Sequence, residues 1–224
     1  MLSISIAWLL AAQVAGAAPA PAGEARVPPK GPVVIMETSK GRIVIELDRA
    51  RAPLTVANFI KYVRGGFYDG TIFHRVVASA GLRVIQGGGF DEQLSEQPTR
   101  PPVRNESING PSNRRGTIAM ARTSDPDSAT AQFYLNVADN TFLDGRPGRP
   151  GYTVFGDVIE GMDVVDRIAA VPTHPKKGMG DVPVEAVVIK RVREAQASGS
   201  PAIQPKAAPG ASPKPAATTA PQAP

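Results

Sequence analysis

Alternating apolar and polar residues predict a series of short strands through the middle of the chain. Residues 33–38 and 42–47 flank a short turn, a pattern typical of a β-hairpin. In the second of these segments Ile43, Ile45 and Leu47 alternate with other positions, so one face of this strand should be buried. Further strands are expected at residues 71–76, 84–86, 117–121, 133–137, 152–158 and 184–192.

Two amphipathic segments predict helices between these strands. Residues 53–64 begin with Pro53, which suits a first helical turn, and place apolar side chains at the i, i+3, i+4 and i+7 positions. A shorter helix is expected at residues 162–170, before Pro172. Roughly six to eight short strands with two helices far apart in sequence favour a closed, mainly antiparallel β-barrel over βαβ units.

The N-terminal residues have the pattern of an export signal. Residues 4–14 are apolar and run into the small residues 15–18, as in a signal-peptide core followed by its cleavage site. The apolar segment is shorter than the ~20 residues of a membrane-spanning helix, so no stable span is expected after cleavage. We therefore expect residues 1–18 to be a signal peptide. Because no Lys or Arg precedes the apolar segment, an uncleaved or buried N-terminal helix is the alternative.

Proline, alanine and glycine dominate the segments on either side of the predicted strands. Residues 19–30 are predicted to be a linker and residues 31–193 the folded domain. Residues 194–224 are predicted to be a disordered tail, because they offer almost no large apolar side chain to bury. A solvated tail without a partner is the simplest interpretation, and a tail that binds envelope components is the alternative.

Composition excludes several classes of chemistry. The chain has 224 residues, no cysteine, two histidines and a net charge of +5. The absence of cysteine excludes disulfides, thiolate catalysis and cysteine-ligated zinc. His74 and His174 are far apart and no phosphate-binding glycine loop occurs, so we expect no metal and no cofactor. Without a long basic run, nucleic-acid binding is not expected, and without an apolar heptad pattern we expect a monomer.

One arginine stands in an apolar segment. Arg75 lies within FHRVV, residues 73–77, where a permanent charge is costly unless it is paired or functional. A strand-surface arginine in a salt bridge is the ordinary interpretation of such a residue.

Arg75 belongs to one of six short sequence motifs that follow one another along the predicted domain. They are YDGTIFHRVV (68–77), QGGGF (86–90), GTIAMAR (116–122), AQFYLN (131–136), FLDG (142–145) and VFG (154–156). Together they resemble the cyclophilins, a family of peptidyl-prolyl cis-trans isomerases, and are most similar to its exported, periplasmic bacterial branch. Any one segment would be weak evidence, but six in order through one domain are specific.

The resemblance implies a mainly β fold, a closed eight-stranded antiparallel barrel capped by two helices, with the active groove outside. It implies a periplasmic isomerase that acts on X-Pro bonds of proline-containing polypeptides during the folding of exported proteins. The family's catalytic arginine, which would donate to the proline nitrogen, falls on Arg75, and its orienting glutamine falls on Gln86. The remaining substrate-binding positions fall on Leu82, Val84, Ala121, Arg122, Gln132, Tyr134, Phe142, Leu143 and Tyr152.

The sequence departs from the family at two places. The stretch between Arg75 and Gln86 is a few residues longer than in relatives, and Arg83 stands where a pocket phenylalanine is expected. Either Leu82 fills that wall or the pocket is more open, so a non-catalytic module that only binds proline-containing segments is the main alternative. Phe142 stands where cyclosporin-sensitive relatives carry tryptophan, and the missing indole N–H donor predicts weak cyclosporin binding.

Overall fold

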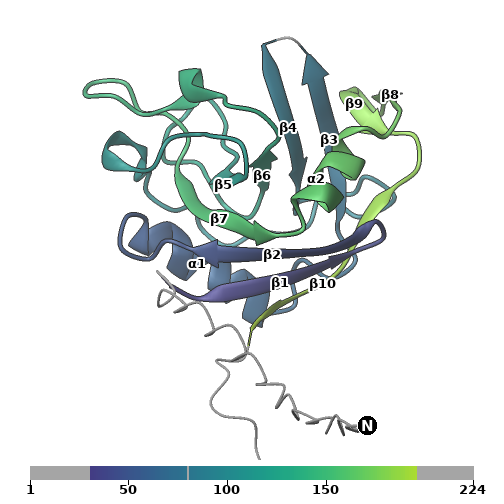
Figure 1. Cartoon of the computed structure of the whole chain (residues 1–224), viewed down its shortest axis with the longest axis horizontal. Helices are drawn as coiled ribbons and strands as arrows, with labels where there is room; N and C mark the ends of the chain where they lie inside the picture. The colour runs from purple at the N-terminus through teal and green to yellow at the C-terminus, as the bar shows by residue number, and fades with distance from the viewer. Residues whose placement is uncertain (1–30, 80, 196–224) are drawn as a thin grey trace, which may run out of the picture.

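Eight strands close into a barrel in the computed structural model, which describes residues 31–79 and 81–195 of the 224-residue chain (Figure 1). Neighbouring strands are antiparallel, in the closed order β1-β10-β3-β4-β6-β5-β7-β2. This confirms the predicted fold class. The barrel strands are β1 (Val33–Thr38), β2 (Gly41–Leu47), β3 (Ile72–Ser79), β4 (Leu82–Gly87), β5 (Thr117–Met120), β6 (Phe133–Asn136), β7 (Val154–Glu160) and β10 (Val187–Glu194).

Neighbouring strands of the barrel differ in how many residue pairs they share. β1 and β2 share six register pairs, whereas β3 and β10 share two, Phe73↔Val187 and Ile72↔Val188. Beyond Phe73, no described strand pairs with the outer edge of β3. β3 continues with β4 as a hairpin that rises above the rest of the barrel (Figure 1).

Two helices lie where the amphipathic pattern predicts them, α1 (Pro53–Arg64) and α2 (Met162–Ala169). α1 packs beside β10, and α2 packs beside β2, β3 and β4. Apolar side chains from both helices join the same buried core as the barrel strands. Two short 3-10 turns, η1 (Ser107–Asn109) and η2 (Thr141–Leu143), lie in the loops that follow β4 and β6.

The N-terminus of α1 is capped from a distant loop. Ala52, at the N-cap position, has no side chain that could accept a hydrogen bond from the first turn. Instead the carboxylate of Glu106 accepts the backbone N–H of Leu54 at 3.0 Å and of Thr55 at 2.8 Å, and the Thr55 hydroxyl at 2.7 Å. A negative charge at this end also interacts favourably with the helix dipole. The helix is thus fixed to the loop before η1.

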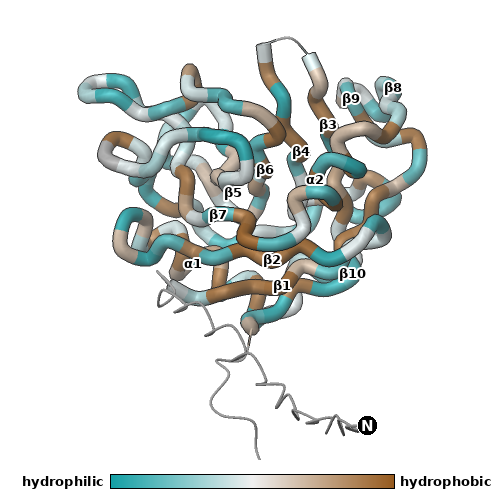
Figure 2. The backbone as a smooth tube through the Cα atoms, viewed as in Figure 1, coloured by the Kyte–Doolittle hydropathy of each residue, from teal (hydrophilic) through white to brown (hydrophobic). Residues whose placement is uncertain are grey.

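Aromatic rings fill the barrel interior. The ring of Phe59 from α1 lies 5.1 Å, centroid to centroid, from both Tyr68 and Phe155, and Phe73 packs edge-on against Phe133 at 6.1 Å. All five side chains are fully buried. Hydrophobic stretches follow the barrel strands β1 and β2, and the peripheral loops are largely hydrophilic (Figure 2).

A second apolar cluster lies on the opposite face of the barrel wall. Successive side chains of a strand point to opposite faces, so Phe133 and Leu135 of β6 join the interior while Tyr134 joins the outer cluster. The same division separates Ile118 from Ala119 on β5. The barrel wall therefore has an interior that stabilises the fold and an apolar outer face that is available for a site.

A two-stranded hairpin outside the barrel was not predicted. It consists of β8 (Thr173–Lys176) and β9 (Met179–Pro183), and the last barrel strand consequently begins at Val187 rather than at residue 184. Pro175 and Pro183 argue against a strand in a sequence pattern, because proline cannot donate to a ladder, yet edge strands tolerate it. The turn between the strands holds Lys177 with φ 50°, a left-handed conformation that sequence periodicity does not reveal.

The folded domain ends slightly beyond its predicted limit. Glu194 pairs with Val34 at the end of β10 and its carboxylate bonds to Arg64, so the tail predicted from residue 194 begins too early. Residues 1–30 and 196–224, with the predicted signal peptide, linker and most of the tail, lie outside the described residues. Within the described part of the chain, no helix is both long and apolar enough to cross a membrane.

The cap on α1 yields a stability prediction. Replacement Glu106→Ala removes the acceptor of three hydrogen bonds and should lower the free energy of unfolding by about 1–2 kcal/mol. Urea denaturation measures the change, with Glu92→Ala, an exposed glutamate in the loop after β4, as the matched control. Equal stability of the two variants would show that Glu106 does not cap α1 in solution.

Candidate active site

The shape of β3 places Arg75 on the outside of the barrel. The register of β3 against β4 shifts between Phe73 and Arg75, so His74 has no partner of its own, as in a β-bulge. Phe73 and Val76, three positions apart, both point into the core, which regular strand alternation would not allow. The extra residue therefore turns Arg75 outward, and its side chain is 43% exposed.

Arg75 stands at one end of a row of residues that crosses the outer face. Directly opposed residues run Arg75–Gln86–Tyr134–Ala119–Val154, from β3 through β4, β6 and β5 to β7. Opposed residues share one face of a sheet, so the row passes from a guanidinium through an amide and a phenol to small and branched apolar side chains. Strands lie about 4.8 Å apart, which puts Arg75 roughly 10 Å from Tyr134 along the sheet.

An apolar cluster on this face gathers most of the predicted substrate-binding residues. Phe142 is the exception among the apolar ones, because its side chain is 53% exposed and lies outside the cluster. A separate cluster fills the interior, so a small ring can be held on the outer face without disturbing the core. The outer cluster comprises buried Val77, Val84, Ala119, Tyr134 and Val154, with Leu82, Ala121, Leu143 and Tyr152 partly buried around them.

The longer stretch before Gln86 extends the β3–β4 hairpin and leaves the cluster intact. The two strands go on pairing through Ala78↔Arg83 and Ser79↔Leu82. Because side chains alternate along β4, Leu82 shares the face of Val84 and packs in the outer cluster, while Arg83 is exposed. Leu82, and not Arg83, therefore lies on the outer face beside Val84.

The amide of Gln86 makes its hydrogen bond along the groove. Its Nε2 donates to Oε1 of Gln132 at 3.0 Å, so the two predicted glutamines contact each other. Gly89 leaves the room for this, because a Cβ there would lie 2.5 Å from Gln132 Cγ. Gln86 is the cross-strand neighbour of Arg75, but the guanidinium has its ion-pair partner elsewhere.

A buried polar network fixes Tyr134 from below. The Tyr134 hydroxyl donates to Oδ1 of Asn113 at 2.6 Å, and Asn113 donates to Asp144 from its backbone N–H at 2.7 Å and from its amide at 3.0 Å. Burial raises the pKa of Tyr134 well above its usual range, so the hydroxyl stays protonated and can donate. Burial opposes ionisation of Asp144, but these bonds and one from Ser112 hold the pKa of its carboxyl below the usual value. Tyr134 is therefore held in one orientation.

Arg122 contacts the ring of Tyr152 and the loop before β7, at the edge of the outer cluster away from Arg75. Its guanidinium carbon lies 4.5 Å from the centre of the Tyr152 ring, a cation–π contact. The same guanidinium donates to the backbone oxygens of Gly151 and Pro150, both at 3.1 Å. Arg122 thus orders the loop before β7 in addition to facing the groove, and Tyr152 in turn packs edge-on against Tyr134 at 5.9 Å.

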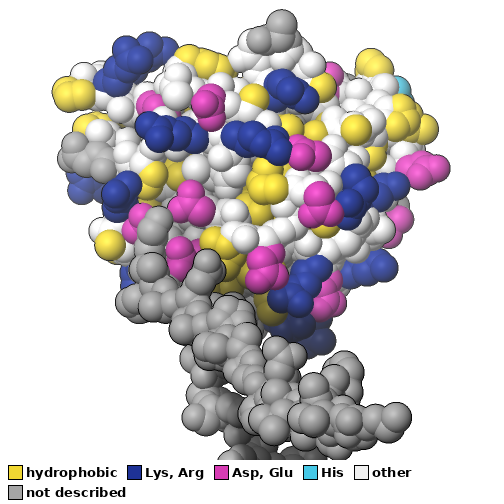
Figure 3. Space-filling view, viewed as in Figure 1, with side chains coloured by type: hydrophobic (Ala, Val, Ile, Leu, Met, Phe, Trp, Pro, Cys, Tyr) yellow, Lys and Arg dark blue, Asp and Glu magenta, His cyan; other side chains and the backbone are white. Residues whose placement is uncertain are grey.

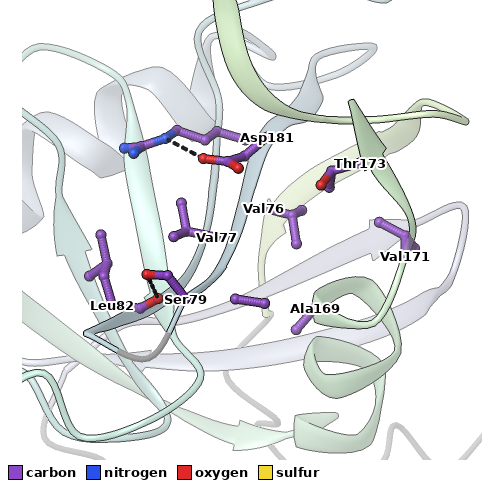
Figure 4. Close-up of a pocket in the computed structure, with 10 residues that line it drawn as sticks. Val76, Val77, Ser79, Leu82, Ala169, Val171, Thr173 and Asp181 are labelled. Carbon is purple, nitrogen blue, oxygen red and sulfur yellow. Dashed lines mark hydrogen bonds and ion pairs between the residues drawn. The ribbon is translucent and has the colours of Figure 1, made fainter. Parts of the chain in front are cut away.

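One residue that lies beside Arg75 was not predicted from the sequence. Asp181 of β9 places a carboxylate oxygen 3.8 Å from Nε of Arg75, within ion-pair distance. A cavity of about 460 Å³ lies beside this pair, between β3, the C-terminal end of α2 and the β8–β9 hairpin (Figure 4). It shares Val77 and Leu82 with the outer cluster. No local pattern signals the contact, because Asp181 belongs to the hairpin that the sequence did not predict.

Charges elsewhere are dispersed. Acidic and basic side chains are interspersed over the face shown in Figure 3 and form no single extended patch there. Within the described residues, no group of three or more His, Cys, Asp or Glu side chains could hold a metal ion. On the outer face the described residues place the charge and N–H groups of Arg75 at one end of a row that leads to an apolar cluster.

His74, the bulged residue, is buried next to Arg75. Its ring packs against Phe90 at 4.6 Å between centroids, and its Nδ1 has no hydrogen-bond partner among the described residues. Burial, with the charge of Arg75 as a smaller contribution, lowers the pKa of His74 to about 4. The imidazole is therefore neutral at pH 7 and serves packing rather than proton transfer.

The domain is similar in sequence to known proteins. The sequence model of the family described as "Cyclophilin type peptidyl-prolyl cis-trans isomerase/CLD" matches residues 33–194. The chain is 52% identical over 161 residues to a peptidyl-prolyl cis-trans isomerase of Acinetobacter baylyi, covering 72% of this chain and 84% of that protein. It is 48% identical over 163 residues to peptidyl-prolyl cis-trans isomerase B of Escherichia coli, covering 71% and 98%.

Solved structures share the fold. A cyclophilin type peptidyl-prolyl cis-trans isomerase of Cryptosporidium parvum, crystallised in the presence of the dipeptide Ala-Pro, superposes with a TM-score of 0.59 at 24% identity. The match covers 73% of this chain and 98% of that one. Cyclophilin AquaCyp293 of Hirschia baltica superposes with a TM-score of 0.58 at 26% identity, covering 71% and 72%.

Burial of His74 generates a pH prediction. The unfolded chain binds a proton near pH 6.5, whereas the folded pKa is about 4. The folded protein is therefore at full stability, as far as His74 is concerned, above pH 6.5. As the pH falls towards 4, protonation of His74 in the unfolded chain lowers the free energy of unfolding by up to about 3 kcal/mol. Urea unfolding between about pH 7 and pH 4.5 should show this loss in the wild type and a shallower slope in His74→Gln. The half-exposed His174, replaced by Asn, is the control, and parallel slopes for all three proteins would contradict the assignment.

Proposed function

The chain belongs to the cyclophilin-type peptidyl-prolyl cis-trans isomerases, and from this premise we propose that it isomerises X-Pro bonds of exported proteins with Arg75 as its catalytic residue. The isomerase activity follows from family membership, and its proline-containing peptide substrates follow with it. One observation supports the proposed mechanism: the row from Arg75 to Val154 sets a cation beside an apolar cluster on the outer face.

The chemistry requires no covalent intermediate. Rotation about a peptide bond meets a barrier of ~18–20 kcal/mol, because amide resonance is lost in the twisted state. In that state the proline nitrogen becomes pyramidal and regains a lone pair. A guanidinium N–H can donate to this lone pair only then, so the interaction lowers the barrier without stabilising either planar isomer.

The outer cluster would hold the proline ring while the preceding residue rotates. Val84, Leu143 and the fixed ring of Tyr134 offer apolar contact. Gln86 and Gln132, tied to each other, present amide groups beside the path of the peptide backbone. Arg75 would then lie over the rotating bond, and its planar, permanently charged fork suits a fixed donor better than a lysine would.

Export is the second part of the proposal. It is supported by residues 1–18, with their apolar core and small-residue cleavage site. Expression of the full chain in a host with a periplasm should give a periplasmic protein whose N-terminus begins near residue 19. N-terminal sequencing of the fractionated protein measures this, and a cytoplasmic protein that retains Met1 would refute export.

The mechanism predicts the effect of one substitution. Arg75→Ala removes a charged hydrogen bond worth ~1.5–3 kcal/mol in the transition state, so kcat/KM should fall roughly 10- to 150-fold. NMR exchange on a short X-Pro peptide measures the rate without an auxiliary protease. The outer cluster does not include Arg75, so the fold should persist.

A matched arginine provides the control for this substitution. Arg193 is 45% exposed and pairs with Glu37 at 3.0 Å, at the barrel face away from the row. Arg193→Ala should leave kcat/KM unchanged. If wild type and Arg75→Ala both bind a proline peptide without turnover, the chain is a binding module instead.

A further inference from the structure

The guanidinium of Arg75 is restrained by the β8–β9 hairpin. Asp181 lies 3.8 Å from it, and the two side chains are 43% and 47% exposed (Figure 4). Among the described residues, Asp181 is the ion-pair partner of Arg75, while the amide of Gln86 is engaged with Gln132. Gln86 thus donates through Nε2 to Gln132, and no hydrogen bond joins its amide to the guanidinium of Arg75 among the described residues.

Contacts on both sides of Asp181 anchor the β8–β9 hairpin to the rest of the domain. Val182 is buried and packs with Ile72 and Leu94, which anchors β9 against the barrel. The turn of the hairpin is fastened by the Lys177 ammonium, which donates to the backbone oxygen of Gln93 at 2.6 Å. The backbone that carries Asp181 is therefore anchored beside β3.

The backbone of Asp181 is itself unusual. Its φ is 58°, in the left-handed region that side chains disfavour and that Asp and Asn tolerate best. Such conformations persist where the surroundings impose them, and they cluster at functional sites. The hairpin adopts this conformation at the residue that contacts Arg75.

The ion pair between Asp181 and Arg75 involves one particular nitrogen of the guanidinium. The carboxylate contacts Nε, the nitrogen nearest the side-chain stem, and among the described residues the two terminal nitrogens of Arg75 have no hydrogen-bond partner, so they can donate to a substrate. We propose that Asp181 is a positioning residue, which orients the guanidinium of Arg75 so that its terminal N–H groups face the rotating bond. The inference rests on the proposed function, because it requires Arg75 to act on the substrate.

The expected effect is modest. Exposed ion pairs contribute little to free energy, and a contact at 3.8 Å is electrostatic rather than a hydrogen bond. Loss of the pair should lower kcat by about 2- to 5-fold. KM should hardly change, because Arg75 contributes in the transition state rather than in the bound peptide. High salt should reduce the difference in kcat between the wild type and a variant without the ion pair, since exposed charges are screened.

A double-mutant cycle tests the proposal. The variants are Asp181→Asn, Arg75→Ala and both together, and Asn keeps the left-handed backbone while it removes the charge. NMR exchange on an X-Pro peptide gives kcat and KM for each, at low and high ionic strength. Glu37→Gln, the partner of Arg193 with a similar exposure of 43%, is the matched control. Urea denaturation checks that all variants are folded.

The outcomes separate this inference from the proposed function. Positioning through Arg75 requires that Asp181→Asn lower kcat in the wild type and have no effect in the Arg75→Ala background. An equal loss in both backgrounds, an unchanged kcat, or a faster Asp181→Asn variant would overturn the positioning role. If Arg75→Ala alone leaves the rate unchanged, it is the proposed mechanism that fails.

Discussion

The site depends on one extra residue in β3. Without the bulge at His74, strand alternation would send Arg75 into the barrel together with Phe73, where a guanidinium has no counter-charge. With it, Phe73 and Val76 both remain in the core and Arg75 faces outward. His74 is neutral and packed, which is the condition for burying the bulged side chain.

The barrel wall gives this site its rigidity. Interior rings lock one face of the strands, and the outer cluster uses the other face of the same strands. Tyr134 is fixed by Asn113 and Asp144, and Tyr152 by Arg122. In the proposed mechanism, differential binding of a twisted transition state needs a surface that does not relax towards the planar isomers, and these contacts would supply it.

The sequence predicts what local pattern and ordered motifs determine. Both helices and the barrel strands lie where periodicity and the family resemblance indicated, and most of the apolar residues predicted to bind substrate lie together in the outer cluster. It does not predict the β8–β9 hairpin, because prolines and a left-handed turn conceal its strands. Asp181 was missed with it. That Leu82 lies on the outer face with Val84 became visible only from the pairing of β3 with β4.

The joint between β3 and β10 is short, and it borders the strand that carries Arg75. Two register pairs close the wall at this joint, against six between β1 and β2. Two further backbone bonds, Gly70 N–H to Ile189 O and Ile189 N–H to Thr71 O, continue this joint just before β3. Val182 of the hairpin that carries Asp181 packs with Ile72 and Val188 from the two sides of the joint, so a change that loosens the hairpin would act both on the closure of the barrel and on the ion pair of Arg75.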